Sequence, residues 1–581
     1  MLKKHKAALL IIFVTALGLR LWFLARLQND LVFHLPSSDP QEFNFLAFWI
    51  KRHDWFWPGL AGHIPFHHTP LYPYFMAVIY QIFGFHINAV VIVQCLLGAL
   101  SACLMYLLTL RLANPLAALV CAGFMTFYWF MIYTQVFLFS ECLAMTINIA
   151  LIYDLIVAKD SLKKYLLGGF LFGASLLCRP DLSLFAGLIL LWIWRQDQSH
   201  KRALCHYGAF ILTVALVLAP VLFRNHEISG SWTLRSQVAS NLYLGNDPDS
   251  YGSNIFVEGG RLWQNFITMP YRELHNNALT ESQVNNFYFQ KTFEKIEEHP
   301  FSWARLIFGK VWSFLTGREF LRSEDVYFRN FFVVPTSLQF LSTSVIFVFA
   351  ISGFFAAWKL RERYQLLNLF LLSSVMSIFF PAKTRYLVPI IPFVMFYAAF
   401  FVSTLYEAVK TRDKSKLVKV VGVFLACVLA SFINPLNLKE PDVSETYYSL
   451  ADNLFRQKDY GLSQQFYQRA LALNPFNSSA WNGLSSVYFL KRDFTNALYC
   501  LGKAAETDGH FAEKYILARN VVLQGLPVPL SLISLNEGDV DSDDDEYVKT
   551  FQFSPVTKPG LRTRRHSSGD NAAIARTRPI G

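Results

Sequence analysis

Long apolar runs constrain this chain more than any other feature, because about 20 consecutive apolar residues can cross a bilayer as a helix. The 581 residues are 54% hydrophobic and only 16% charged, which is unlike an ordinary soluble protein. The runs that predict a span lie near residues 7–27, 87–110, 115–135, 137–157, 164–178, 182–194, 204–223, 335–358, 364–380, 385–408 and 417–434. The sequence therefore predicts an all-α, polytopic membrane helix bundle with about eleven transmembrane helices.

The first run follows a basic N-terminus, as a signal peptide would. No small-x-small cleavage site follows it, and the apolar run continues past Arg20 to Leu27. The length of the run therefore favours a first membrane span over a cleaved peptide.

Basic residues are concentrated in the short loops between the runs. If Lys3, Lys4 and Lys6 are cytoplasmic, the alternation of spans places every Lys/Arg-rich short loop on that same side, as the positive-inside rule requires. This orientation explains the net charge of +11 without a nucleic-acid partner. We expect a multi-pass protein of the inner (cell) membrane, with the first loop, the segment 224–334 and everything after about 435 on the periplasmic or extracytoplasmic side.

Composition divides the chain into three parts. Residues 1–434 are expected to form the membrane domain, with a large outer loop at 224–334 that contains helices near 281–298 and 301–316. Residues 444–525 are expected to form a tetratricopeptide repeat (TPR) domain, because 444–475 and 478–509 repeat their large, small and aromatic positions with a 34-residue offset. Residues 526–581 have the low complexity and charge of a disordered tail.

Acidic residues in the first outer loop are the first candidates for chemistry. Ser37-Ser38-Asp39-Pro40 before an apolar run is typical of a helix N-cap, and a carboxylate at that place can also serve as a general base or bind a metal. Glu42 is expected to face the same side one turn later. His63, His67 and His68 are either metal ligands or ordinary polar loop residues.

Three cations lie at the predicted outer ends of other helices. Arg179, Lys383 and Arg385 are placed either to extend their charges to the membrane interface or to bind an anionic lipid headgroup such as a phosphate. Both interpretations remain open from the residues alone.

A series of short motifs occurs along the chain on the predicted outer face. They are Arg20 at the end of the first helix, Asp39 and Glu42, Pro70-Leu71-Tyr72-Pro73, Ser140-Glu141, Arg179-Pro180, Asn241-x-Tyr243-x-Gly245-Asn246-x-Pro248 and Arg385-Tyr386-x-x-Pro389. In this order they resemble membrane glycosyltransferases of the GT-C superfamily, and within it the bacterial dolichyl-phosphate-mannose-protein mannosyltransferase-like branch, which is often fused to tetratricopeptide repeats.

The resemblance implies transfer of a sugar from a polyprenyl-phosphate donor, with inversion, to an acceptor protein, lipid or glycan. Asp39 would be the general base and Glu42 a supporting acid, while Arg179, Lys383 and Arg385 would bind the donor phosphate. Tyr243 and Asn246 would belong to a substrate loop. A divalent metal ion is a candidate cofactor, and the TPR domain is a candidate site for a protein partner.

Two other functions remain as alternatives. A non-enzymatic transporter or flippase of lipid-linked sugars would be favoured by charges buried in mid-helix and by repeated halves. A membrane-anchored TPR scaffold would leave the long polar outer loop without a purpose.

Overall fold

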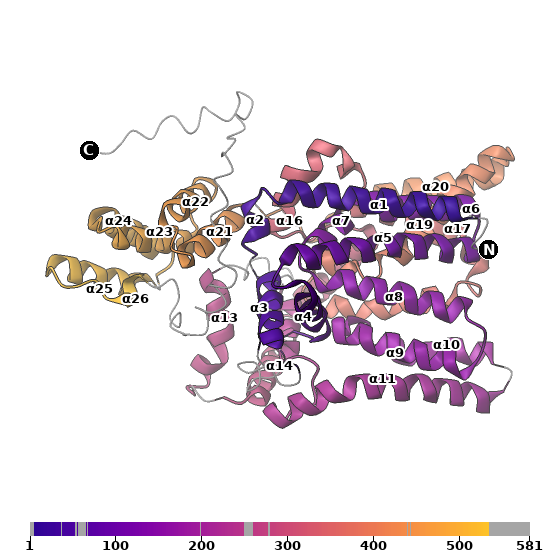
Figure 1. Ribbon diagram of the computed structural model, residues 1–581, viewed down its shortest axis with the longest axis horizontal. Coiled ribbons are helices and arrows are strands. Elements are labelled where there is room, and N and C mark those ends of the chain that lie inside the picture. Colours follow the sequence, from indigo (N-terminus) through magenta and orange to yellow (C-terminus); the bar gives the residue numbers. More distant parts are fainter. Residues whose placement is uncertain are drawn as a thin grey trace. The chain divides into compact units, whose positions relative to one another are not determined.

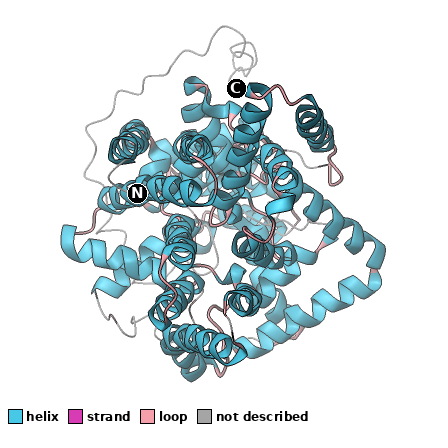
Figure 2. Ribbon diagram, turned by 90° about the vertical axis from the view of Figure 1, so that its right-hand side faces the viewer, coloured by secondary structure: helices cyan, strands magenta, loops and turns pink. Residues whose placement is uncertain are grey.

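The computed structural model describes residues 5–533 except 37, 53–54, 56–65, 67, 198, 249–259, 277–278, 438–439, 442 and 510. Every regular element among these described residues is a helix or a short helical turn (Figure 2). The predicted all-α class is therefore confirmed. The chain divides into two compact units, Met1–Asp539 and Val540–Gly581, and the second lies outside the described residues.

Long apolar helices form the bundle. Side by side lie α1 (Lys6–Leu27), α5 (Ile87–Leu112), α8 (Ser140–Val157), α9 (Leu162–Cys178) and α11 (His200–Ser229) (Figure 1). The other bundle helices are α6 (Pro115–Phe127), α7 (Trp129–Val136), α10 (Phe185–Gln196), α17 (Thr343–Ala356), α18 (Gln365–Ser373), α19 (Ile391–Lys410) and α20 (Lys414–Ser431). Every predicted apolar run contains one of these helices.

Fewer of these helices are long enough to span on their own. In the described part of the chain, five are long and apolar enough to cross a membrane, or up to six when α6 and α7 count as one broken span. Three shorter apolar helices, which begin at Phe185, Thr343 and Gln365, bring the number closer to the predicted eleven, while a fourth, Leu71–Phe83, corresponds to no predicted span. The membrane bundle is thus confirmed, while the exact number of spans stays a prediction.

The broken helix α6–α7 is held by polar side chains from two neighbours. The chain bends by 51° between the two helices, which leaves carbonyls near the break without helical partners. Arg20 of α1 donates to the carbonyl of Met125 (3.0 Å) and to the side chain of Gln135, and Gln94 of α5 donates to the carbonyl of Phe137 (2.7 Å). Sequence analysis placed Arg20 at the end of the first helix, which is wrong: the helix continues to Leu27, and Arg20 is fully buried in its interior.

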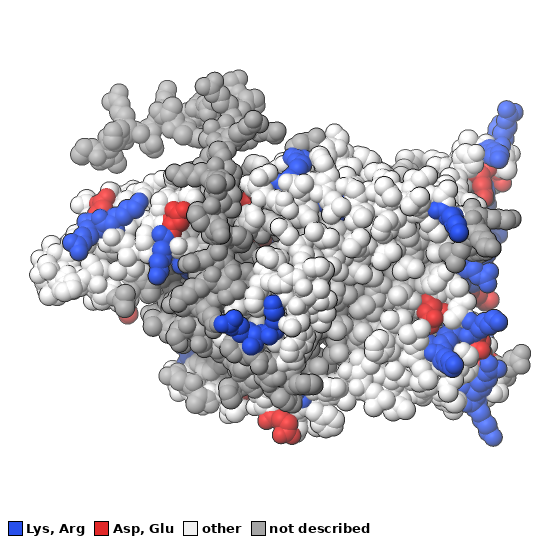
Figure 3. Space-filling model, viewed as in Figure 1, with Lys and Arg blue, Asp and Glu red and all other residues white. Residues whose placement is uncertain are grey.

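The Lys- and Arg-rich loops meet at one end of the bundle. Helix α1 begins there, α5, α8 and α10 end there, and α11 begins there (Figure 1). Figure 3 shows blue side chains gathered at this end and a broad uncharged face along the middle of the bundle. The chain alternates as the positive-inside rule predicts.

A layer of shorter helices covers the opposite end. It consists of α2 (Leu31–His34), α3 (Asp39–Arg52), α4 (Leu71–Phe83), α12 (Val238–Asn246), α13 (Gly260–Glu273), α14 (Glu281–Glu298), α15 (Pro300–Thr316) and α16 (Ser323–Phe328). The helices predicted near 281–298 and 301–316 are confirmed as α14 and α15.

The C-terminal module consists of α21 (Ser444–Arg456), α22 (Tyr460–Leu473), α23 (Ser478–Leu490), α24 (Phe494–Thr507) and α25 (Phe511–Leu523). Its first two helix pairs match one another at an offset of 34 residues: Asp459 and Asp493 cap the second helix of each pair, and Lys458 and Arg492 before them both have positive φ. The two helix pairs predicted from the repeat are therefore present. Their assignment to the tetratricopeptide class stays a prediction.

One element of the structure lies within the predicted tail. A short helix, α26 (Leu530–Ile533), contacts α23, and Leu532 is fully buried. The described structure of the helical module therefore includes residues beyond 526, because α26 packs against α23. Residues 534–581 lie outside the described residues.

Gly353 tests the packing of the bundle. It lies where α17 meets α19, and a Cβ there would collide with the backbone carbonyl of Tyr397. We expect Gly353→Ala to lower the free energy of unfolding by about 1–3 kcal/mol through overpacking. Thermal unfolding of the purified protein in detergent measures this change. The control is Gly422→Ala, where a Cβ would meet nothing within 4 Å, and equal melting temperatures for the two variants would contradict the packing.

Candidate active site

Asp39 lies at the start of α3 and contacts Arg385. The carbonyl of Ser38 accepts the backbone N–H groups of Gln41 (3.0 Å) and Glu42 (3.2 Å), so Ser38 occupies the cap position and Asp39 is the first helical residue. This corrects the expectation that Asp39 caps the helix. Its carboxylate instead forms an ion pair with the Nη2 of Arg385, which is 2% exposed.

A chain of buried ion pairs continues from Arg385 into the bundle. The Nε of Arg385 lies 3.5 Å from Glu141 Oε1, and the same oxygen accepts a hydrogen bond from Arg179 Nη1 (2.6 Å). Arg179 also donates to Asp181 Oδ2 from Nε (2.8 Å) and Nη2 (2.6 Å). Asp39, Arg385, Glu141, Arg179 and Asp181 therefore join α3, α8, the end of α9 and two 3-10 turns, η3 (Pro180–Leu182) and η11 (Thr384–Leu387).

Local structure explains why these charges meet. The chain turns after α7, and α8 begins at Ser140, so Glu141 lies in the first turn of a helix, where a carboxylate is favoured. Helix α9 ends at Cys178, and Pro180 opens a 3-10 turn that brings Asp181 back to Arg179. Thr69 donates to the carbonyl of Cys178 (2.5 Å), which fixes this helix end to the segment before α4.

Several cations act on the single carboxylate of Asp39. Burial alone would raise its pKa, but the charges of Arg385, Lys383, His68 and Arg322 together hold the pKa of Asp39 well below its usual range. Asp39 is therefore ionised at neutral pH. While the pair with Arg385 is intact, it is also a weak base.

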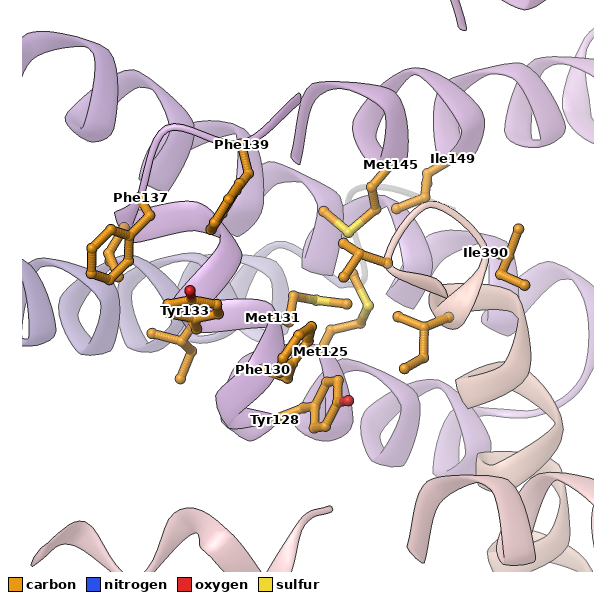
Figure 4. Packing of buried hydrophobic residues seen from close by; sticks show 14 of the residues in the cluster. Met125, Tyr128, Phe130, Met131, Tyr133, Phe137, Phe139, Met145, Ile149 and Ile390 are labelled. Carbon is orange, nitrogen blue, oxygen red and sulfur yellow. The ribbon is translucent and has the colours of Figure 1, made fainter. Parts of the chain in front are cut away.

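Aromatic rings pack against the guanidinium groups of Arg179 and Arg385. Arg179 lies over the Tyr386 ring with its Cζ 4.1 Å from the centroid, and Arg385 lies 5.4 Å from the same centroid. The Cζ of Arg385 also lies 5.2 Å from the centroid of the Phe139 ring. Figure 4 shows Phe139 beside Phe137 and Tyr133, at the end of the broken helix. The α6–α7 break thus supplies the wall against which Arg385 packs.

Glu42 accepts a hydrogen bond from His68 Nε2 (2.6 Å) if that nitrogen carries the proton. His63 and His67 lie outside the described residues. The described surroundings of Asp39 do not fit a divalent metal ion, because Arg385, Lys383 and Arg322 already act on this carboxylate and would repel a cation.

One cluster with metal-binding geometry occurs elsewhere in the described residues. Single ligand atoms of Asp160, Asp197 and His206 lie within 4.8 Å of one another, but Arg202 contacts both carboxylates. The whole length of α9 separates this cluster from Arg179, so it is not placed to serve Asp39.

The predicted substrate-loop residues pack within the outer layer. Asn246 donates to the carbonyl of Phe379 (2.9 Å) and accepts from Trp303 Nε1 (2.9 Å). Tyr243 lies against Phe266, with ring centroids 6.2 Å apart. Both lie on α12, which contacts the 3-10 turn η10 (Ser374–Phe379) that precedes Lys383 and Arg385.

Lys310 of α15 forms hydrogen bonds to α12 and to the segment that precedes Lys383 and Arg385. It is 3% exposed, and its Nζ donates to the carbonyls of Gly245 (2.8 Å) and Phe380 (2.6 Å). Burial lowers the pKa of Lys310 to about 7. Helices α12 and α15 together therefore position the turn that carries Arg385.

Sequence analysis placed Asp39 and Arg385 on the same outer face, and the structure brings them into contact. It did not name Glu141, Asp181, Arg322 or Tyr386 as members of the site. Glu141 was noted only as part of a motif. Asp181, two residues after Arg179, carried a usable signal in its spacing. The composition of the charged run Arg322-Ser323-Glu324-Asp325 was a second usable signal.

A sequence profile supports the resemblance found in the motifs. Residues 67–223 match the family described as dolichyl-phosphate-mannose-protein mannosyltransferase. The resemblance to this family is thus confirmed over that segment, which includes Glu141, Arg179 and Asp181. No curated protein matches the chain.

Solved structures with a similar arrangement are distant in sequence. The oligosaccharyltransferase of Archaeoglobus fulgidus in the apo form has 11% identity and a TM-score of 0.42, over 79% of this chain and 59% of that one. The same enzyme with zinc and sulfate has 13% identity and a TM-score of 0.41, over 78% and 56%. ArnT from Cupriavidus metallidurans bound to undecaprenyl phosphate has 12% identity and a TM-score of 0.31, over 77% and 90%. The chain thus spans under two thirds of the length of the oligosaccharyltransferase.

Glu141 tests the ion-pair chain. Glu141→Gln leaves the buried guanidinium groups of Arg179 and Arg385 with one carboxylate fewer, and we expect it to lower the free energy of unfolding by about 3–5 kcal/mol. The matched control is Asp160→Asn, whose pair with Arg202 is about half exposed (43% and 49%). That pair should contribute about 1 kcal/mol or less. Chemical unfolding in detergent compares the two, and a similar loss for both variants would contradict a buried network.

Lys310 gives the stability a pH dependence. The pKa of Lys310 falls from 10.5 in the unfolded chain to about 7 in the folded one. At pH values between 7 and 10.5, the side chain is therefore protonated in the unfolded chain and neutral in the folded chain. The free energy of unfolding should therefore rise with pH in this window, by up to about 1.4 kcal/mol per pH unit, and this contribution should not change below it. Unfolding curves of the native protein and of Lys310→Met test this, with the exposed Lys163→Met as control. Equal slopes for native protein and Lys310→Met would refute the assignment.

Proposed function

We propose that this chain is a membrane glycosyltransferase that moves a sugar from a polyprenyl-phosphate donor to an acceptor hydroxyl. One observation carries the proposal: at one end of an apolar bundle, several buried cations converge on the single carboxylate of Asp39. A lipid phosphate needs such cations at the edge of an apolar region, and a hydroxyl nucleophile needs such a carboxylate. The profile match over residues 67–223 supports the same activity.

The donor phosphate binds to Arg385 and Lys383. Arg179 is less suited to this role than the sequence suggested, because Glu141 and Asp181 already balance its charge. Its role is to hold Glu141, which lies 3.5 Å from the Nε of Arg385 and so orients that guanidinium group.

Donor binding also prepares the base. In the absence of donor, Arg385 pairs with Asp39 and keeps the pKa of that carboxyl low. A phosphate that takes Arg385 as its partner releases Asp39, and the pKa of Asp39 then rises towards the range in which a carboxylate accepts a proton. The base therefore becomes effective only when donor is present.

The transfer is a single inverting displacement. The acceptor oxygen attacks the anomeric carbon and gives its proton to Asp39, while the bond between that carbon and the phosphate oxygen breaks. The products are the glycosylated acceptor and the polyprenyl phosphate. Arg385 and Lys383 stabilise the charge that develops on the leaving phosphate. Glu42, which is paired with His68, is the supporting acid beside Asp39 in this proposal.

The site faces away from the cytoplasm in this proposal. Helix α3, which begins at Asp39, lies at the end of the bundle opposite the Lys- and Arg-rich loops (Figure 1). The positive-inside rule supports a cytoplasmic position for those loops, and the site is then on the periplasmic side of a bacterial inner membrane in this proposal. The acceptor is a protein, lipid or glycan, and the C-terminal module is the candidate surface for a protein partner.

Asp39→Asn tests the role of the base. We expect transfer from a radiolabelled polyprenyl-phosphate sugar to fall by about a hundred- to ten-thousand-fold, as for loss of a general base. Binding of polyprenyl phosphate should be kept, because the cations then lose a competing carboxylate. The assay uses membranes that contain the full chain, with an acceptor extract.

Glu362→Gln is the control, because Glu362 is exposed in a loop between α17 and α18 at the other end of the bundle. Full transfer by Asp39→Asn would rule out the assigned base. Loss of transfer in both variants would point to a general effect of the substitutions on the protein.

A further inference from the structure

Arg322 is a buried cation with no role so far in the proposed reaction. It directly precedes α16 and is 4% exposed. Its Nη2 lies 3.6 Å from Asp325 Oδ1, and its Nε lies 3.8 Å from Glu324 Oε2. Both distances are longer than a hydrogen bond, so these two contacts are charge attractions without directed hydrogen bonds.

Arg322 lies beside the Asp39–Arg385 pair. The Cζ atoms of Arg322 and Arg385 lie 5.5 Å and 5.2 Å from the centroid of the same ring, that of Phe139. The charges of Arg322 and Arg385 oppose one another, and both act on the carboxylate of Asp39. Glu324, Asp325 and Asp39 offset part of this positive charge, and a phosphate, with up to two negative charges, would offset more of it.

Helix α16 packs against α7, the second half of the broken helix. The ring of Phe328 lies 4.9 Å from that of Tyr133 and 6.4 Å from that of Trp129, both on α7. Tyr327 of α16 also donates to Asp30 Oδ2 (2.9 Å), just before α2. Helix α16 is therefore fixed to the same wall that supports Arg385.

Helix α16 also contacts α21 of the C-terminal module. Ser323, the residue after Arg322, shares a hydrogen bond of 2.6 Å with the hydroxyl of Thr446 on α21 and accepts the backbone N–H of Thr446 (3.0 Å). Tyr447 packs edge-on against Tyr327, with ring centroids 6.1 Å apart. A few residues later, Arg329 forms two hydrogen bonds with Glu440, of 2.7 and 2.6 Å.

We propose that Arg322 is a third cation of the donor-phosphate site, beside Arg385 and Lys383, and that α21 of the C-terminal module holds it there. The inference rests on the proposed function, since it assigns a further ligand to the same lipid phosphate. It gives the module a task at the active site itself, in addition to any partner that it binds.

The test is binding of undecaprenyl phosphate to the full-length protein in detergent, measured by equilibrium binding of the radiolabelled lipid. We expect Arg322→Gln to weaken binding by about tenfold or more, as for loss of a charged hydrogen-bond donor. Arg322→Lys keeps the charge and should recover part of the loss. Undecaprenol, which has no phosphate, should bind equally to all variants.

The matched control is Arg318→Gln. Arg318 precedes Arg322 in the same segment, but its Nη2 donates to the carbonyls of Ser431 (3.3 Å) and Ile433 (3.4 Å). This variant should bind undecaprenyl phosphate as the native protein does. A monodisperse gel-filtration peak identifies variants that have folded, and Arg322→Lys carries the test if Arg322→Gln does not fold.

The outcomes separate this inference from the proposed function. If Arg385→Gln loses binding and both Arg322 variants retain native affinity, Arg322 is not a phosphate ligand and the proposed function stands. If Arg385→Gln and Lys383→Gln also keep native affinity, the phosphate site itself is wrong.

Thr446→Val tests the link to the module. It removes a hydroxyl that bonds Ser323 and should weaken binding less than Arg322→Gln does. In the Arg322→Gln background it should add nothing, because both changes then act through the same guanidinium group. Additive effects of the two substitutions would show that α21 acts on the site by another route and would overturn this part of the inference.

Discussion

The buried chain of charges from Asp39 to Asp181 is the interaction on which the rest of the site depends. Its five members come from four segments far apart in the sequence, and none of these charges is stable alone in an apolar setting. The charges are therefore compensated only when each segment packs at the matching position along the axis of the bundle. Such a network adds little stability compared with apolar packing, but it makes any other arrangement of these segments costly.

The broken helix α6–α7 is the second constraint, and it supports the first. Its bend leaves backbone carbonyls that lipid cannot satisfy, and Arg20 donates to one of them, that of Met125, while Gln94 donates to the carbonyl of Phe137 after the end of α7. Arg20 is thus a charge buried in mid-helix, the feature that would favour a transporter. The N–H groups of Arg20 donate to the carbonyls of Ala16 and Met125 and to the side chain of Gln135. These hydrogen bonds give Arg20 a structural role, and its burial needs no transport function to explain it. The break in turn places Phe139 and Glu141 beside Arg385.

The outer layer connects this site to the C-terminal module. Helices α12 and α15 clamp the turn before Arg385 through Asn246 and Lys310, while α16 lies between Phe139 and α21. Asn246, one of the two residues assigned to a substrate loop from the sequence, thereby supports the turn. The reason is geometric: Gly245 allows the backbone at Phe379 and Phe380 to approach so closely that a Cβ would not fit.

The sequence by itself determined the all-helical membrane class, the positions of the apolar helices, the paired helices of the module and the choice of Asp39 and Arg385 as candidates. These follow from local properties, namely apolar length, repeat period and the order of short motifs. Only the tertiary structure decided that Asp39 is the ion-pair partner of Arg385 and not a helix cap, that Arg179 and Arg385 share Glu141, and that Arg322 acts on the same carboxylate of Asp39. Pairings between distant charges depend on how helices pack and where one of them breaks, and no local pattern in the chain encodes that.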